Sequence, residues 1–216
     1  MDNVGVAVIG SGGIGTLRAH SCAQIPQVGH MAICDIDSEK LDRLAETVRA
    51  DVVTKDYREA IEDDRVKAVI ISTDEESHYG PAKLAAELGK PVLIEKPFVL
   101  NLDEADDIIE VAKKNNTPVF VGYTQRFRKR YLLAKQSVDA GNLGDVIMAL
   151  GKIYVTRAVG EAVARRSPNT TPSINTLTYM VDLILWYMEG KKPVEVYARS
   201  ASKVFKKYNR DDFQWL

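Results

Sequence analysis

The chain has 216 residues, 45% of them hydrophobic and 27% charged, a composition typical of a folded protein that buries a core of its own. Its 29 basic and 30 acidic side chains leave a formal net charge of −1, so charge alone predicts neither a nucleic-acid partner nor a membrane partner. No apolar run approaches the length that crosses a bilayer and no leader-like segment precedes Val4, which favours a cytoplasmic protein.

The two cysteines and three histidines do not form a metal-binding pattern. There is no CxxC spacing, and Cys22 and Cys34 fall within an expected helix and an expected strand. We therefore expect two small buried thiols and no metal site.

Short apolar runs alternate with helical patterns through the first 122 residues. The runs are continuous rather than alternating, which indicates strands covered on both faces. Helix signals lie between them: Pro26 stops the first helix, and Ser38 is expected to cap the second. This alternation predicts an α/β fold, a doubly wound parallel Rossmann sheet with right-handed crossovers. The expected strands are 4–9, 30–34, 66–72, 92–95 and 119–121, and the expected helices are 14–24, 38–49, 79–88 and 101–115.

The pattern changes after Gly122, where we place a domain boundary. Strands and helices no longer alternate regularly, which indicates a second, α+β domain. The two domains are then residues 1–122 and 123–216. In the second we expect a helix at 129–140, a strand at 146–159, a Pro/Ser/Thr-rich loop at 160–172, a helix at 173–188 and a strand at 194–201.

A glycine-rich turn follows the first expected strand and matches GxGxxG. Gly10 permits a tight turn, Gly12 lets the backbone approach a pyrophosphate, and Gly15 allows a helix to pack closely on the strand. Gly13 and Ile14 begin that helix, whose free N–H groups and dipole favour phosphate. Glycine turns are common, so the prediction of a dinucleotide site depends on this position between strand and helix.

Asp35 supports the same interpretation, because it ends the next expected strand about 20 residues after Gly15. A carboxylate there accepts hydrogen bonds from ribose hydroxyls and repels a 2′-phosphate. Ile36 follows it rather than an arginine, so we expect NAD in preference to NADP. The alternative is that Asp35 merely ends a strand.

Further motifs follow in a fixed order, and together they resemble the Gfo/Idh/MocA oxidoreductases, the family of glucose-fructose oxidoreductase and inositol dehydrogenase. The resemblance implies a Rossmann domain, a second domain on an open mixed sheet, and hydride transfer between a nicotinamide and a sugar, polyol or related carbinol. It extends along essentially the whole chain. The motifs are Ile71-Ser72-Thr73 leading to His78, Glu95-Lys96-Pro97, Gln125-Arg126-Phe127, Gly141-Asn142-Leu143-Gly144 and Val181-Asp182-Leu183.

Lys96 is a candidate catalytic and substrate-binding residue just beyond a central strand, at the edge where such sheets bind ligands. Pro97 favours an extended backbone at Lys96 and so holds its direction. An ammonium shielded by cofactor and substrate has a lowered pKa and can assist deprotonation of a hydroxyl. The alternative is a solvated surface lysine. The resemblance also brings both Glu95 and Lys96 to the cofactor.

Tyr179 is the candidate acid/base residue of the second domain. Many members of the family carry Asp-x-x-x-His in this helix, whereas this chain has Asn175-x-x-x-Tyr179. Tyrosine can exchange a proton if a cation such as Lys96 stabilises its phenolate, and Asn175 can hydrogen-bond a substrate hydroxyl. Helical spacing puts both on one face with Asp182 and Trp186, which either lines a cleft or faces solvent.

Of four further candidate residues, Thr73 has one interpretation and the other three have two each. Thr73 and His78 lie where the family binds its cofactor, although His78 can equally begin the helix at 79. Arg126 is expected either to contact cofactor or substrate or to form a surface ion pair. Asp182 is expected as a substrate ligand or as a structural residue.

The segment 211–216 resembles the start of a strand, and members of the family are usually about half as long again. We therefore expect an incomplete second sheet, and either a truncated product or association into a homo-oligomer through that sheet. The leading hypothesis is an NAD-dependent dehydrogenase for a sugar-like hydroxyl. The main alternative is a noncatalytic NAD-binding sensor on the same scaffold. A methyltransferase fits less well, because the Glu-Lys-Pro triplet has no role in it.

Overall fold

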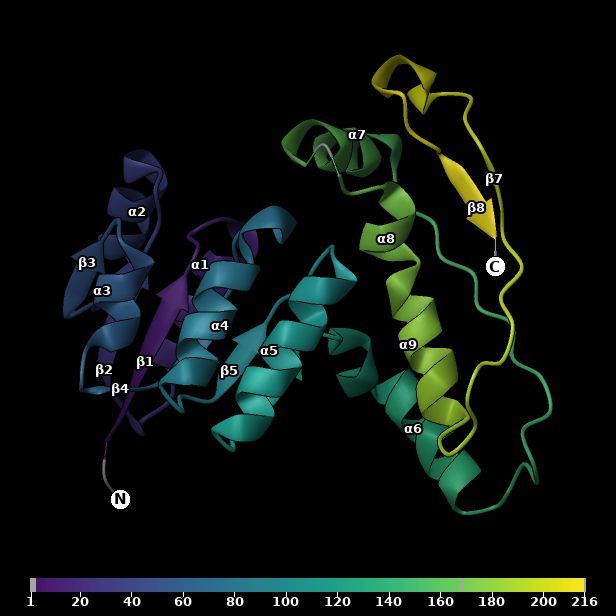
Figure 1. Ribbon diagram of the computed structural model, residues 1–216, viewed down its shortest axis with the longest axis horizontal. Coiled ribbons are helices and arrows are strands. Elements are labelled where there is room, and N and C mark those ends of the chain that lie inside the picture. Colours follow the sequence, from purple (N-terminus) through teal and green to yellow (C-terminus); the bar gives the residue numbers. More distant parts are fainter. Residues whose placement is uncertain (1–2, 168, 216) are drawn as a thin grey trace. The chain divides into compact units, whose positions relative to one another are not determined.

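A computed structural model describes residues 3–167 and 169–215 of the chain (Figure 1). The chain forms two compact units, Met1–Gly122 and Tyr123–Leu216. Among the described residues, no helix combines the length and the apolar character that crossing a membrane requires.

A six-stranded parallel sheet forms the centre of the first unit. The strand order is β3-β2-β1-β4-β5-β6, so the direction of winding reverses between β1 and β4, which is where such sheets open a ligand crevice. The predicted α/β class, with its doubly wound parallel sheet, is confirmed. The strands are β1 (Val4–Ile9), β2 (Val28–Cys34), β3 (Val52–Thr54), β4 (Val66–Ile71), β5 (Val92–Ile94) and β6 (Val119–Val121).

Helices connect these strands and cover the sheet (Figure 1). One cap differs from the prediction: Asp37 caps α2, because its side chain accepts hydrogen bonds from the backbone N–H groups of Glu39 and Lys40, and Ser38 is already helical. The edge strand β3 and the short helix after it have no counterpart among the predicted elements, because three residues are too few to show a period. The helices are α1 (Gly13–Ala23), α2 (Ser38–Ala45), α3 (Tyr57–Glu62), α4 (Tyr79–Glu87) and α5 (Leu102–Lys114), with a 3₁₀ turn at Glu75–Ser77.

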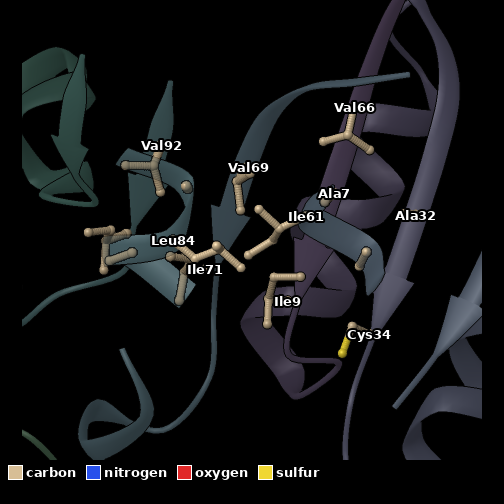
Figure 2. Packing of buried hydrophobic residues seen from close by; sticks show 14 of the residues in the cluster. Ala7, Ile9, Ala32, Cys34, Ile61, Val66, Val69, Ile71, Leu84 and Val92 are labelled. Atoms are coloured by element: carbon tan, nitrogen blue, oxygen red, sulfur yellow. The ribbon is translucent and has the colours of Figure 1, made fainter. Parts of the chain in front are cut away.

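Side chains of β1 alternate between two buried clusters. Val6 and Val8 belong to the cluster that includes residues of α1 and α2, and Ala7 and Ile9 to the one that includes residues of α3, α4 and α5. This two-sided burial explains the continuous apolar runs of the sequence. Figure 2 shows the second cluster, which also contains Ala32, Ile61, Val66, Val69, Ile71, Leu84 and Val92.

Both cysteines are buried and free, as the sequence predicts. Burial, together with the nearby carboxylates of Asp35, Asp56 and Glu59, raises the pKa of the Cys34 thiol to about 12. Burial also raises the pKa of Cys22. Both side chains therefore stay neutral and act as small apolar groups in the core.

The second unit contains helices and a two-stranded antiparallel sheet. The helix predicted at 173–188 is present but interrupted at Leu177. The strand predicted at 194–201 is shorter, and it pairs with the strand expected near the end of the chain. The elements are 3₁₀ turns at Thr124–Phe127 and Phe205–Tyr208, α6 (Lys129–Asp139), α7 (Arg157–Arg166), α8 (Pro172–Thr176), α9 (Thr178–Tyr187), β7 (Arg199–Ala201) and β8 (Phe213–Trp215).

The prediction of a strand at 146–159 and a loop at 160–172 is wrong. Residues 146–156 have no regular secondary structure, and α7 begins at Arg157, where Thr156 caps it by accepting a hydrogen bond from Val159 N–H. A strand needs a neighbour to pair its backbone, and here Ile147 is 90% exposed. Gly160 of α7 packs against the ring of Phe205, and a Cβ at this position would lie only 2.6 Å from that ring.

A charged cluster lies beside β2 in the first unit. His30 is placed between two carboxylates, with Nδ1 3.2 Å from Asp51 Oδ2 and Nε2 3.1 Å from Asp63 Oδ2. Asp63 also accepts hydrogen bonds from the guanidinium and backbone N–H of Arg65, which hold its pKa well below the usual range. A bond from Met31 N–H lowers the pKa of Asp51.

We expect this cluster to make the free energy of unfolding depend on pH in the acidic range. A carboxyl whose folded pKa is depressed stabilises the fold above its unfolded pKa of about 4 and loses that contribution as pH falls through the folded pKa. Asp63→Asn should therefore flatten the fall of the unfolding free energy between about pH 5 and pH 2. Urea unfolding across that range measures it, with Asp64→Asn, the exposed neighbouring carboxylate, as control. Equal flattening by both variants would contradict the assignment.

Candidate cofactor and proton-transfer sites

A cavity of about 540 Å³ opens in the first unit where β1, β2 and β4 end. Residues predicted from the sequence line it, among them Gly10, Gly12, Asp35 and Thr73. Its position is the crevice that the reversal of strand order creates. The structure thus brings the glycine turn and the acidic residue of β2 to one cavity.

Two of the glycines are required by the packing of the turn itself. Gly10 has a φ of +96°, and a Cβ there would lie 2.6 Å from the backbone carbonyl of Ser72. A Cβ on Gly15 would collide with the carbonyl oxygen of Gly10. These positions need glycine for folding, because the helix, the turn and β4 approach one another through bare backbone.

Gly12 and Gly13 differ, since a Cβ on either would meet nothing within 4 Å. Gly12 is the N-cap of α1, and no side chain caps the helix there. The first amide groups of α1, including that of Ile14, therefore begin an uncapped helix beside open space. A phosphate fits this position, because it accepts hydrogen bonds from such amides and is favoured by the helix dipole.

Asp35 is held at the edge of the cavity by hydrogen bonds to the turn. Its Oδ2 accepts from Ser11 N–H at 2.6 Å and from Ser11 Oγ at 2.8 Å, and its Oδ1 accepts from Asp37 N–H at 2.9 Å. The sequence analysis did not single out Ser11, which is 5% exposed. Its position between two glycines of the turn was the feature of the sequence that could have indicated it.

Two hydroxyl groups at the end of β4 also point to a ligand. Within the described part of the chain, Ser72 Oγ and Thr73 Oγ1 are buried and have no hydrogen-bond partner. Both residues line the cavity. Because an unsatisfied buried hydroxyl is costly, these two groups fit the polar part of a dinucleotide. Thr73 was predicted, whereas Ser72 was mentioned only within its motif.

His78 has a structural position. It is 1% exposed, its Nδ1 lies 3.0 Å from the carbonyl oxygen of Pro97 and 3.1 Å from that of Phe98, and its Nε2 lies 3.3 Å from that of Thr73. The imidazole therefore joins the loops that follow β4 and β5. These contacts favour the second of its two sequence interpretations, at the start of α4.

The Glu-Lys-Pro triplet follows β5 directly. The Glu95 carboxylate is bound by Arg18 of α1, with Nη2 at 2.5 Å and Nε at 3.0 Å from Oε1. This ion pair attaches the end of β5 to the helix that begins at the glycine turn, and so holds the backbone at Lys96, which is partly buried. Arg18 is a further residue that the sequence analysis missed.

In the second unit the predicted polar residues of α9 are paired with the segment before α6. Arg126 donates from Nε to Asp182 Oδ2 at 2.9 Å and from Nη2 to Oδ1 at 2.6 Å, and its guanidinium lies 5.3 Å from the ring centre of Trp186. The Asp182 side chain is 8% exposed. This bidentate pair occupies both carboxylate oxygens, which favours the structural interpretation of Asp182.

Tyr179 lies on the same helix as Asp182, against another tyrosine. The rings of Tyr179 and Tyr123 meet edge to face with centres 6.3 Å apart, and Tyr123 Oη lies 2.8 Å from Thr178 Oγ1. Asn175 is 7% exposed. Asn175 of α8 and Asp182 of α9 are thus buried and Tyr179 is partly buried, and Tyr123, which was not predicted from the sequence, packs on Tyr179. Lys96 belongs to the first unit and Tyr179 to the second.

Residues 3–167 and 169–215 hold no group of three or more His, Cys, Asp or Glu side chains placed to bind a metal ion. The polar groups of the candidate sites described above are amides, hydroxyls, carboxylates, an ammonium and a phenol.

Comparisons with known proteins match the part of the chain that contains the cavity to an NAD-binding family. The family GFO_IDH_MocA, described as an oxidoreductase family with an NAD-binding Rossmann fold, matches residues 4–123. The myo-inositol 2-dehydrogenase of Thermotoga maritima is 33% identical over 139 residues, 64% of this chain and 42% of that protein. The inositol 2-dehydrogenase of Salmonella typhimurium is 29% identical over 194 residues, 88% of this chain and 56% of that protein. The chain spans about half the length of these relatives.

Solved structures share the fold. A probable dehydrogenase from Thermotoga maritima matches with a TM-score of 0.82 and 26% identity, over 98% of this chain and 63% of that one. A scyllo-inositol dehydrogenase from Lactobacillus casei, solved with NAD(H) and scyllo-inositol, matches with a TM-score of 0.85 and 22% identity, over 99% of this chain and 65% of that one. The second likeness concerns the fold alone.

The two kinds of glycine should respond differently to alanine. Gly12→Ala should leave the unfolding free energy within about 1 kcal/mol of the original, since the new methyl group meets open space. It should weaken NADH binding at least about tenfold, because that space is where we expect the pyrophosphate of the cofactor to approach the backbone. Gly15→Ala should destabilise the fold by roughly 1–3 kcal/mol or more. Urea unfolding and NADH fluorescence titration separate the two, and unchanged NADH binding by Gly12→Ala would refute the pyrophosphate position.

Proposed function

Because this chain belongs to the Gfo/Idh/MocA family of oxidoreductases with an NAD-binding Rossmann fold, we propose that it binds NAD in its first unit and transfers hydride between the nicotinamide and a carbinol carbon. The substrate class is a sugar or polyol. Relatives named inositol 2-dehydrogenase make cyclitols the first compounds to test.

One observation carries the cofactor proposal: the open glycine turn and Asp35 line the same cavity. The amides at Gly12 and Gly13 would hold the pyrophosphate, and Asp35 would accept hydrogen bonds from the adenosine ribose. The unpartnered hydroxyls of Ser72 and Thr73 would gain partners from the same ligand. The Asp35 carboxylate also favours NAD, because a 2′-phosphate brought to it would be repelled.

Lys96 and Tyr179 are the proposed catalytic residues. When bound, NAD supplies the hydride acceptor. Tyr179, in its phenolate form, would take the proton of the substrate hydroxyl and become a neutral phenol, and the Lys96 ammonium would bind the substrate oxygen and stabilise the negative charge that develops on it. The Glu95–Arg18 pair supports this role of Lys96, since it holds the backbone next to it.

The remaining polar residues of the second unit would bind or orient. Asn175 would hydrogen-bond a second hydroxyl of the polyol. The pair of Arg126 and Asp182 would keep α9, and with it Tyr179, in place. Asp182 then acts on the substrate only through the helix that it anchors.

A noncatalytic NAD sensor is the second candidate. Its basis is Asn175 at the position of an expected acid, because an amide cannot titrate, whereas the relatives named as dehydrogenases do not favour it. Titration with NADH followed by a screen of sugars and polyols distinguishes the two functions. NADH binding without turnover of any substrate would support the sensor.

The catalytic assignment predicts a defined kinetic result. Lys96→Met and Tyr179→Phe should each lower kcat at least about a hundredfold, because each removes a group that acts on the transferred proton. NADH affinity should change less than about threefold. Lys114→Met, an exposed lysine at the end of α5, is the matched control and should behave like the original chain. Retained turnover in both catalytic variants would exclude these roles.

We also propose that copies of the chain associate through the second unit. Among the described residues its small sheet has two strands, and apolar side chains elsewhere in this unit, such as Ile147 and Val194, are 90% and 99% exposed. Open strand edges and exposed apolar side chains favour pairing with another chain. Analytical ultracentrifugation should show a concentration-dependent oligomer. A stable monomer at every concentration would contradict this.

A further inference from the structure

An ion pair forms part of the wall of the cofactor cavity. Lys40 Nζ lies 2.9 Å from Asp37 Oδ2, and both residues line the cavity together with Asp35. The Asp37 hydrogen bond and charge raise the pKa of Lys40, and the more distant charges of Asp35 and Asp74 act in the same direction. The Lys40 ammonium thus stands near the carboxylate that would receive the adenosine ribose.

The two oxygens of Asp37 have separate tasks. Oδ1 caps α2 by accepting hydrogen bonds from Glu39 N–H at 3.1 Å and Lys40 N–H at 3.3 Å. Oδ2 holds the Lys40 ammonium. An asparagine at position 37 can keep the cap through its amide oxygen and lose the negative charge. The cap and the charge can therefore be tested independently.

We propose that the Asp37–Lys40 pair is a second determinant of cofactor choice, acting beside Asp35 to reject the 2′-phosphate of NADP. The inference rests on the proposed binding of NAD in this cavity. Asp37 contributes in two ways: it adds a negative charge to the wall, and it holds the ammonium that a 2′-phosphate would need as its counter-ion.

The chemistry of the wall supports this. A 2′-phosphate carries up to two negative charges and is bound in proteins by lysine or arginine. Lys40 and Lys55 are the ammonium groups that line the cavity, but Asp35, Asp37 and Asp74 line it as well. The Lys40 side chain is 54% exposed and flexible enough to turn toward a new anion once Asp37 no longer holds it.

The test compares NADH and NADPH binding to the full chain by fluorescence titration. Asp37→Asn should tighten NADPH binding about five- to tenfold and change NADH binding less than about twofold, since only NADPH carries the added phosphate. Glu39→Gln is the matched control, because it removes the Glu39–Arg43 pair from an exposed face of the same helix outside the cavity. It should change neither affinity.

Lys40→Met in the Asp37→Asn background completes the test. If Lys40 is the counter-ion, this second substitution should remove most of the increase in NADPH affinity that Asp37→Asn produces. Circular dichroism and thermal melting verify that each variant keeps the fold. Unchanged NADPH affinity in Asp37→Asn, with NADH still bound, overturns the inference alone. Failure of the original chain to bind NADH overturns the proposed function, and the inference with it.

Discussion

The first unit depends on a contact between bare backbones. Gly10 lies against the backbone of Ser72 and Thr73, and Gly15 lies against the carbonyl of Gly10, so that β1, β4 and α1 converge where no side chain fits. This convergence opens the cavity on one side and leaves the start of α1 uncapped beside it. The space at Gly12 that a phosphate would use thus follows from the packing of its neighbours.

Polar side chains then hold the edge of the sheet. Ser11 fixes Asp35, Arg18 binds Glu95, and His78 joins the loops that follow β4 and β5 through backbone carbonyls. Each links elements distant in sequence, and together they restrict the backbone around Lys96. A site whose supporting contacts are in place before the ligand arrives loses less entropy on binding.

In the second unit, too, contacts between side chains hold in place an element that carries a candidate site residue. The bidentate pair of Arg126 and Asp182 anchors α9, while Tyr123 packs on Tyr179. A phenol on an anchored helix can be presented in one orientation, as proton transfer requires. The buried residues of this helix are Met180, Leu183 and Asp182, and the pairing with Arg126 offsets the loss of water around the Asp182 carboxylate.

The sequence alone determined the features that local rules control: the buried strands of the first unit, the glycine turn, and Asp35 after β2. Each depends on neighbours within a few residues, so spacing and residue type are enough. Only the tertiary structure decided the partners. The apolar segment 146–159 has the composition of a strand, but among the described residues no strand pairs with it, and part of it is helical. The carboxylate of Asp182 and the imidazole of His78 find hydrogen-bond partners in residues 56 and 20 positions away, and no local pattern encodes such contacts.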